Sequence, residues 1–425
     1  MEDRIYRPRI ADQHLAEYIE TFGAVVVEGP KWCGKTTTAR QQTKSEFNIA
    51  DPRGAYQNRQ IALLNPDKAL QGARPHLVDE WQEAPAIWDA VRFLCDQAMG
   101  EPGQFVLTGS ATPRLEERPM HSGAGRIGRM RMDTMTLFEL GASSGKVSLA
   151  ALFAGECPQD AGLLEIPILA ELVCRGGWPG SMNMTTDRAL LVSRSYLDAV
   201  ANEDMQRVAG TRHDPEKVRR IIASLARNES TLATQKTIIA DASMPDEALL
   251  NQETVGDYIK ALKQMFFVAD IPAWRPALRS PVRIRSAAKR HLADPSLVAA
   301  ALNATPSSLT RDLKTLGLLF ESLVLHDLLV YARAFDAQVM HYRDDSDLEV
   351  DAIVERRDGS WGAFEVKLGI DQVDRAAQNV LRLEKKMVER GEQPPAVKAV
   401  IVGTGGVAHR RNDGVCVVPI DTLAP

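Results

Sequence analysis

The segment that begins at Gly29 fits the phosphate-loop pattern G-x-x-x-x-G-K-[ST] without departure. In such a loop the backbone N–H groups point inward and wrap a phosphate, and the glycines allow its close approach. Lys35 is expected to reach the β- and γ-phosphates of ATP, and the hydroxyl of Thr36 is expected to hold Mg²⁺. A chance Gly-Lys-Thr turn is the alternative, which the apolar stretch before the loop disfavours. The residues predicted to contact the nucleotide are Gly29, Pro30, Lys31, Trp32, Cys33, Gly34, Lys35, Thr36 and Thr37.

Two acidic residues, Asp79 and Glu80, follow the apolar stretch 76–78 further along the chain. Asp79 is expected to bind Mg²⁺, through water. A second carboxylate one residue later can polarise the attacking water, which is the work of a general base. A strand that merely ends in two acids is the alternative. The pair favours a phosphate-loop protein that hydrolyses ATP over a simple nucleotide kinase.

Two further groups of polar residues are candidates for contact with the γ-phosphate. Thr108 or Ser110, at the end of the next apolar stretch, is predicted to sense this phosphate, whereas a plain Gly-Ser turn is the alternative. The segment from Arg118 to Arg131 is basic, and an arginine at the γ-phosphate can stabilise transition-state charge. Arg126 and Arg129 are the candidates, from the same or a neighbouring subunit, and a solvated basic loop is the alternative.

The C-terminal part carries the spacing D…E-x-K at Asp351, Glu365 and Lys367. Alternation along a strand places Glu365 and Lys367 on one face, and Asp351 can join them across a hairpin. Two carboxylates could hold Mg²⁺ and the lysine could activate water for phosphodiester hydrolysis. A surface ion pair on a strand edge, worth little, is the alternative.

This spacing resembles the PD-(D/E)xK nuclease core, although Val350 stands where the proline would be. The resemblance implies that Glu321, on the preceding helix, joins Asp351 and Glu365 as a metal ligand. Gln372 or Gln378 could add a polar contact. A domain that keeps this fold and has lost catalysis is the other interpretation.

A basic segment runs from Arg275 to Arg290, directly after Trp274. A helical pattern at 252–264 precedes it and could be a recognition helix, but it carries Glu253 and Asp257 as well as lysines. Contact with the DNA backbone is the favoured interpretation, and a protein-docking module is the alternative. The basic residues are Arg275, Arg279, Arg283, Arg285, Lys289 and Arg290.

The elements that must position these residues divide the chain into three parts. In 1–145, apolar runs at 24–28, 76–79 and 104–108 alternate with helical patterns at 35–42 and 85–99, which predicts a parallel, helix-covered sheet. In 146–305 the pattern is helical, with helices around 215–225, 236–240 and 252–264 before two extended stretches. That order is typical of a winged helix-turn-helix.

In 306–425 a helix at 313–331 is followed by strands at 338–342, 348–354 and 361–366, a helix at 371–390, and strands at 398–402 and 415–419. This order predicts a compact α/β unit with its own core.

Composition bounds these assignments. The 425 residues carry a net charge of −5, so only local clusters can point to nucleic acid or membrane. The five cysteines lie far apart in sequence, which argues against a disulfide framework or a zinc site and fits a reducing cytoplasm. Neither a signal peptide nor a membrane-spanning run is expected. Cys33 could be an oxidisable thiol but is interpreted as structural.

Together, the segments 6–9, 29–36, 78–81, 107–110 and 124–127 resemble a family of prokaryotic AAA+-type ATP-binding proteins. In that family an N-terminal AAA domain precedes a C-terminal domain of unknown function. The resemblance covers essentially the whole chain and is most specific in its first third. It implies an ASCE-type phosphate-loop ATPase, a winged helix and a restriction-endonuclease-like C-terminal unit.

The resulting expectation is an Mg²⁺-dependent ATPase whose nucleotide state is coupled to DNA. The alternative is a nucleotide-switched signalling or scaffold protein with a protein partner and an inactive C-terminal domain. A homo-oligomer is compatible with either.

Overall fold

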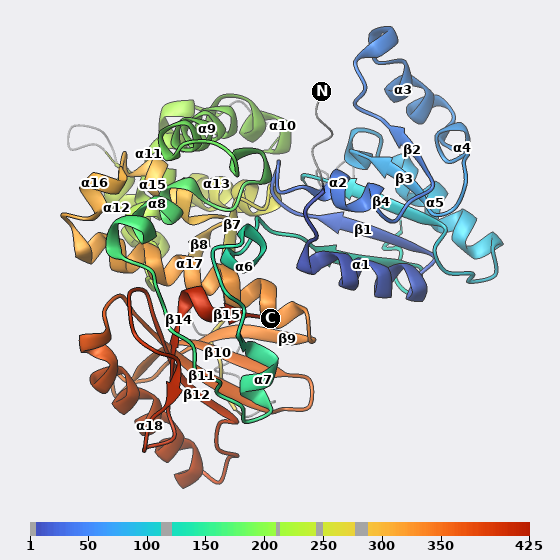
Figure 1. Cartoon of the computed structure of the whole chain (residues 1–425). Coiled ribbons are helices and arrows are strands. Elements are labelled where there is room, and N and C mark those ends of the chain that lie inside the picture. The colour runs from blue at the N-terminus through green and yellow to red at the C-terminus, as the bar shows by residue number, and fades with distance from the viewer. Residues whose placement is uncertain (1–5, 112–120, 210–212, 244–249, 277–287) are drawn as a thin grey trace. The chain divides into compact units, whose positions relative to one another are not determined.

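Residues 6–111, 121–209, 213–243, 250–276 and 288–425 are described by the computed structural model of the chain. They form two compact units, each assembled from more than one stretch of chain (Figure 1). Unit 1 comprises Met1–Thr134, Asp204–Arg212 and Lys260–Phe267. Unit 2 comprises Met135–Glu203, His213–Ile259 and Val268–Pro425.

Unit 1 contains a five-stranded parallel sheet in the order β2-β3-β4-β1-β5. The inner strands β1, β3 and β4 are almost entirely buried, as expected for strands covered on both faces. All strands run in one direction, so the carboxyl ends of these three lie side by side at one edge. The strands are β1 (Ala24–Glu28), β2 (Ser45–Asn48), β3 (His76–Asp79), β4 (Phe105–Gly109) and β5 (Ile127–Arg131).

Two apolar clusters attach helices to the faces of this sheet. On one face Val25 and Val27 of β1 share a cluster with residues of α1 and α2. On the other face Val26 shares a cluster with Ile87 and Val91 of α5, which lie one turn apart on the same side of that helix. The helices are α1 (Ile10–Thr21), α2 (Lys35–Arg40), α3 (Arg53–Leu64), α4 (Pro66–Ala69), α5 (Ala86–Gln97) and α10 (Met205–Ala209).

The middle of the chain is helical. α11 (Pro215–Arg227) begins where the Asp214 side chain accepts a hydrogen bond from the Glu216 N–H, with proline at the first helical position. After α12 and α13 an antiparallel hairpin follows, formed by β7 (Val268–Ile271) and β8 (Lys289–Leu292). The other elements of this part are α6 (Leu137–Leu140), β6 (Val147–Ser148), α7 (Leu149–Phe153), α8 (Ile166–Arg175), α9 (Thr186–Ala199), a π-helix (Val200–Asp204), α12 (Gln235–Ala242), α13 (Gln252–Gln264), α15 (Pro295–Ala301) and α16 (Pro306–Leu309).

The C-terminal part contains a six-stranded mixed sheet in the order β13-β14-β12-β11-β10-β9. The β9–β10–β11 segment is an antiparallel meander, and β11, β12 and β14 are parallel. α18 packs its apolar residues against the sheet. The elements are α17 (Leu313–Arg333), β9 (Ala337–Arg343), β10 (Glu349–Arg356), β11 (Trp361–Lys367), α18 (Val373–Glu389), β12 (Val397–Val402), β13 (His409–Arg410), β14 (Cys416–Pro419) and β15 (Leu423–Ala424).

The predicted strands and helices are present, and most of their ends agree to within one or two residues. The edge strands β2 and β5 were not expected, because β2 is polar and β5 lies in the basic segment that was examined only for an arginine finger or a solvated loop. The contacts also join segments distant in sequence, so the two units do not follow the three contiguous parts.

α17 corrects the expectation that no segment is long and apolar enough to cross a membrane. Its 21 residues include a window of mean hydropathy 1.5, which meets the criteria of length and composition. However, 61% of that window is buried inside the structure, and residues such as Leu316, Phe320 and Leu328 are fully buried. A core helix accounts for this composition.

Candidate functional site

The phosphate loop connects the carboxyl end of β1 to the amino end of α2. Gly34 adopts a left-handed conformation with φ of 105°, which a glycine accommodates without strain. At Gly29 a Cβ atom would lie 1.9 Å from the Met132 carbonyl oxygen, so only glycine fits there. The Lys35 ammonium group donates to the carbonyls of Gly29 and Pro30, at 3.0 and 2.8 Å. The loop therefore curls around the lysine that was predicted to bind phosphate.

The Asp79 carboxylate connects the phosphate loop to the neighbouring strands. Its Oδ1 accepts hydrogen bonds from the Thr36 hydroxyl at 2.8 Å and from the Thr108 hydroxyl at 2.5 Å. The sheet order causes this meeting, since β4 lies between β1 and β3 and brings Thr108 opposite Asp79. Thr108, one of the two residues predicted to sense the γ-phosphate, thus lies on the strand between the phosphate-loop strand and the acidic strand.

Glu80 follows Asp79 in a left-handed backbone conformation, with φ of 56°. Its Oε2 accepts hydrogen bonds from the Ser110 hydroxyl at 3.2 Å and from the Gln82 side-chain amide. Burial, reinforced by the nearby Asp79 charge, raises the pKa of Glu80 above its usual value. A carboxylate with a raised pKa accepts a proton more readily, which suits a general base.

These residues fit ATP and Mg²⁺. The hydroxyl of Thr36 and the carboxylate of Asp79 are hard oxygen donors, 2.8 Å apart, of the kind that Mg²⁺ prefers. The phosphate loop, which has room only for glycine at position 29, and the buried Lys35 supply the contacts that a polyphosphate requires.

The structure does not bring Arg126 to the phosphate loop. Arg126 immediately precedes β5, and its carbonyl accepts a hydrogen bond from Ala24 N–H at the amino end of β1. The phosphate loop follows the opposite end of β1, so the two sites lie a strand length apart within unit 1. The Arg126 side chain is paired with Asp96 at 2.7 Å.

Arg129 is likewise engaged elsewhere. Its guanidinium donates to Glu28 at 2.6 Å and lies 4.6 Å from the centre of the Trp88 ring. These contacts place it on the α5 side of the sheet, whereas α2 covers the other side. Arg118 lies outside the described residues.

Two cations fix the loop by contacts that the sequence did not predict: Arg9, which was assigned no role, and Lys31, which was predicted only to contact the nucleotide. Arg9, only 7% exposed, donates to the carbonyls of Cys33 and Asp133 at 2.7 and 2.9 Å. Lys31 pairs with Asp204 of the π-helix at 2.5 Å. The segment 6–9 contributed to the family resemblance, so its pattern could have pointed to Arg9, but no local pattern could have revealed the distant Asp204.

The C-terminal residues predicted to cluster do so. The Lys367 ammonium contacts Glu365 at 2.6 Å and Asp351 at 3.1 Å. The Val366 N–H also donates to Asp351 at 2.8 Å. The polar contact from α18 comes from Asn379, which donates to Glu365 at 3.3 Å, whereas Gln372 and Gln378 are exposed.

A second lysine occupies this cluster, and the sequence had placed it in the basic segment. Lys289 of β8 is 1% exposed and its ammonium lies 3.2 Å from Glu321, 2.8 Å from Glu349 and 4.0 Å from Asp351. Burial opposes its charge, but the surrounding carboxylates outweigh this and raise its pKa above the usual value. Lys289 is therefore a core residue and cannot contact DNA.

The carboxyl groups of this cluster differ in their pKa values. Burial, reinforced by the Asp351 charge, raises the pKa of Glu321 and of Glu365 to about 8. Although burial acts to raise it, Lys367 and Lys289 hold the pKa of Asp351 below its usual value. Among the residues that the structure describes, no group of three or more His, Cys, Asp or Glu side chains is arranged to hold a metal ion. The charges of the predicted metal ligands Glu321, Asp351 and Glu365 are thus offset by the positive charges of two lysines.

Other parts of the basic segment also turn inward. Trp274 is 1% exposed and stacks 4.5 Å from Trp361, and Arg275 lies 5.2 Å above the Tyr342 ring. Arg290 lies 3.8 Å from Asp270 across the hairpin. Arg279, Arg283 and Arg285 lie outside the described residues.

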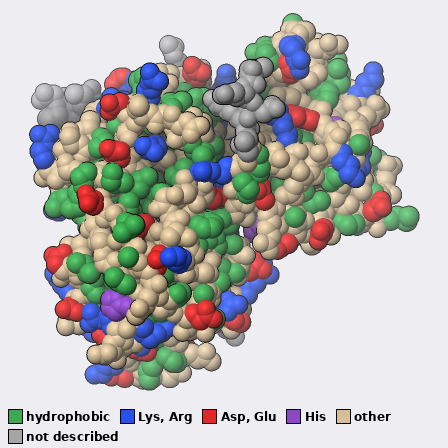
Figure 2. Space-filling model, in the orientation of Figure 1, with side chains coloured by type: hydrophobic (Ala, Val, Ile, Leu, Met, Phe, Trp, Pro, Cys, Tyr) green, Lys and Arg blue, Asp and Glu red, His purple; other side chains and the backbone are tan. Residues whose placement is uncertain are grey.

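An open hollow lies at the amino end of α13, the candidate recognition helix. Glu253 and Asp257 are among the residues that line it. Two carboxylates at the amino end of a helix disfavour the approach of phosphates. On the face shown in Figure 2, lysine and arginine side chains are interspersed with acidic ones.

Three family matches divide the chain. Residues 21–141 match the AAA domain, residues 166–308 match a domain of unknown function (DUF8612), and residues 316–423 match another (DUF4143). Uncharacterized proteins of Mycobacterium bovis and Mycobacterium tuberculosis are each 24% identical over 365 residues, which is 84% of this chain and 73% of theirs.

Among solved structures, the Walker-type ATPase PABY2304 of Pyrococcus abyssi is 13% identical, with a TM-score of 0.45, over 71% of this chain and 97% of its own. The RuvB Holliday junction branch migration motor of Thermotoga maritima is 18% identical, with a TM-score of 0.26, over 66% of this chain and 90% of its own. The phosphate-loop geometry and the match over residues 21–141 agree: the chain contains an AAA-type ATPase domain, followed by two domains of unknown function.

Proposed function

We propose that this protein binds Mg²⁺–ATP at the phosphate loop and hydrolyses it, with Glu80 as the general base. The observation that carries the proposal is the convergence on Asp79, whose carboxylate accepts hydrogen bonds from Thr36 and Thr108 beside the buried Glu80. Lys35 binds the β- and γ-phosphates, and Asp79 and Thr36 hold Mg²⁺. When bound, Mg²⁺ neutralises charge on the phosphate oxygens.

In this proposal Glu80 accepts a proton from the attacking water, which bonds to the γ-phosphorus as the bond to the ADP oxygen breaks. Ser110 and Gln82 orient the carboxylate through their hydrogen bonds. Thr108, bonded to Asp79, senses the γ-phosphate. No described arginine of unit 1 is assigned as a finger, so any such arginine comes from another segment or another copy of the chain.

The test is ATP turnover by the purified chain, with Lys35→Ala and Glu80→Gln measured beside it. We expect Lys35→Ala to lose nucleotide binding, and Glu80→Gln to keep binding while losing turnover. Full activity in Glu80→Gln would overturn the assigned base.

A finer part of the proposal is coupling of this cycle to a partner. The order α11, α12, α13 and the β7–β8 hairpin supports a winged helix, and DNA was the favoured partner for such a module. The buried Lys289 and the acidic start of α13 support a protein partner instead. Turnover should therefore be measured with duplex and single-stranded DNA, at low and near-physiological salt. Stimulation that fades with salt would establish DNA coupling, and turnover that ignores DNA would favour the signalling or scaffold role.

For the C-terminal cluster we propose a charge-balanced structural role rather than nuclease catalysis. The observation behind this is that Lys289 and Lys367 together contact all four carboxylates of the cluster. The purified chain should not cut DNA with Mg²⁺ or Mn²⁺. Cutting that disappears in both Asp351→Ala and Lys367→Ala would overturn this proposal, whereas cutting that survives both changes comes from a contaminant.

A further inference from the structure

Two cysteines that are distant in sequence meet in unit 2. Cys157 lies in the stretch after α7 and is half-buried, while Cys416 is the first residue of β14 and is buried. The side chains of Cys157 and Cys416 lie within reach of a hydrogen bond to each other. Both are free thiols. The sequence separation, which argued against any cysteine pairing, is therefore bridged by the fold.

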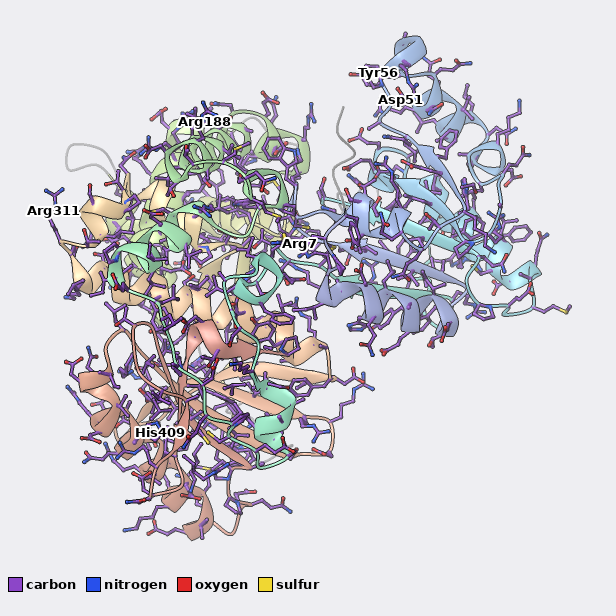
Figure 3. The ribbon with its side chains drawn as sticks, viewed as in Figure 1. Arg7, Asp51, Tyr56, Arg188, Arg311 and His409 are labelled. Carbon is purple, nitrogen blue, oxygen red and sulfur yellow. The ribbon has the colours of Figure 1, made fainter. Side chains whose placement is uncertain are left out.

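Backbone contacts hold the two cysteines in place. The stretch after Cys157 runs beside residues 405–408, with Ala408 N–H donating to Asp160 at 2.7 Å and Gly162 N–H donating to Gly406 at 2.9 Å. Arg410 pairs with Cys416 across β13 and β14, and its guanidinium donates to the Gly155 carbonyl at 3.0 Å. Figure 3 labels His409, the neighbour of Arg410 on this edge strand. These contacts hold the two segments that carry the cysteines beside each other.

The environment makes the two thiols chemically unequal. The hydrogen bond from Cys416, helped by the positive charge of Arg410, lowers the pKa of Cys157 to about 7. The same hydrogen bond and burial raise the pKa of Cys416. Burial also raises the pKa of Cys95 to about 11 and that of Cys174 to about 12. A partly exposed thiolate next to a second thiol is the arrangement that oxidants attack selectively.

We propose that Cys157 and Cys416 are a redox-modification site, at which a hydroperoxide converts the two thiols to a disulfide. The Cys157 thiolate attacks one oxygen of hydrogen peroxide, the O–O bond breaks, and the departing hydroxide leaves as water after taking a proton. The sulfenic acid formed at Cys157 is then attacked by the Cys416 sulfur. The S–S bond forms, the S–O bond breaks, and the second water carries away the Cys416 proton. One peroxide and two thiols thus give one disulfide and two waters.

The test uses the full chain with hydrogen peroxide as the oxidant. After treatment, the remaining thiols are alkylated in denaturant and the digest is analysed by mass spectrometry. We expect a peptide pair linked through Cys157 and Cys416, lighter by ~2 Da than the two reduced peptides and released by dithiothreitol. The matched control is Cys174→Ser, which removes a buried cysteine outside the pair and should leave this linked peptide unchanged.

Single variants separate the two steps. In Cys416→Ser the reaction should stop at the sulfenic acid, which dimedone labels at Cys157. In Cys157→Ser both the linked peptide and the dimedone adduct should vanish, and circular dichroism should confirm that this variant is folded. If oxidised wild-type protein shows no linked pair, or if Cys95 and Cys174 react as fast as Cys157, the proposal fails.

Discussion

Glu80 combines a left-handed backbone conformation with a buried carboxylate, and such strain is common where catalysis fixes a side chain. We expect Glu80→Gln to lower ATP turnover by about 10²- to 10⁴-fold, because the amide cannot accept the proton, while nucleotide affinity changes little. Steady-state turnover and equilibrium ATP binding measure the two effects. Glu83→Gln, three residues away, is the matched control and should keep wild-type turnover.

Thr108 allows a second residue-scale prediction. Thr108→Val keeps the branched shape but removes the donor to Asp79, so the carboxylate loses one of its two hydroxyl partners. We expect turnover to fall by roughly 10- to 100-fold, the equivalent of a lost hydrogen bond to a charged group. Thr43→Val, whose hydroxyl bonds only the Ala39 carbonyl among the described contacts, should have little effect. Equal turnover in both variants would remove Thr108 from the site.

At this scale the sequence predicted which residues lie together wherever a local pattern constrains them. Lys35, Thr36 and Asp79 were identifiable because loop geometry and strand ends constrain their residue types. The positions of Arg126 and Arg129 could not be predicted, because nothing in a run of arginines tells which end of a strand, or which face, each one occupies. Lys289 was assigned to a surface for the same reason: its carboxylate partners lie on α17 and β10.

At the scale of elements, β8 delivers a buried cation into the C-terminal sheet. Lys289→Met should lower the free energy of unfolding by about 3–5 kcal/mol, because Glu321 and Asp351 would lose a partner inside the protein. Urea titration followed by tryptophan fluorescence measures this change. The control Lys385→Met removes an exposed i,i+4 pair and should stay within about 0.5 kcal/mol. Similar values for both variants would show that the cluster contributes no stability.

Two glycines allow predictions of opposite sign for the effect of substitution by alanine on stability. Gly317 lies inside α17 with open space where a Cβ would project, so Gly317→Ala should stabilise unit 2 by about 0.5–1 kcal/mol. At Gly29 the same change meets the Met132 carbonyl oxygen and should destabilise unit 1 by about 1–3 kcal/mol. Thermal unfolding of the two variants should shift in opposite directions, and a shift in the same direction would contradict the packing described here.

The bounds of helices and strands with strong periodicity could be predicted from the sequence. The elements against which they pack could not. The alternation in β9–β11 and the apolar face of α18 gave nearly correct bounds, because burial on one side leaves its mark on the sequence. The β7–β8 hairpin was also foreseen. The burial of Lys289 on β8 was not, because a two-residue period cannot tell which face of a hairpin strand points into the protein.

At the scale of the whole molecule, unit 1 depends on segments far from its sheet. A fragment of residues 1–145 contains the predicted ATPase domain but lacks Asp204, the partner of Lys31, and Phe266, which lies 4.6 Å from the Arg131 guanidinium. We expect this fragment to melt at a lower temperature than the full chain and to bind ATP more weakly. Calorimetry and nucleotide titration measure both. A fragment with the affinity and melting temperature of unit 1 in the full chain would show that the later segments are dispensable.

The interleaving of the two units also has a consequence for synthesis. A ribosome delivers the chain from its amino end, so the sheet and phosphate loop emerge long before the segment Lys260–Phe267 that completes unit 1. At the usual speed of translation the wait is on the order of ten seconds. During this interval the nascent chain contains the complete phosphate-loop motif, but unit 1 still lacks its last segment. We therefore expect full ATP affinity only late in synthesis, after much of the helical part of unit 2 has been made.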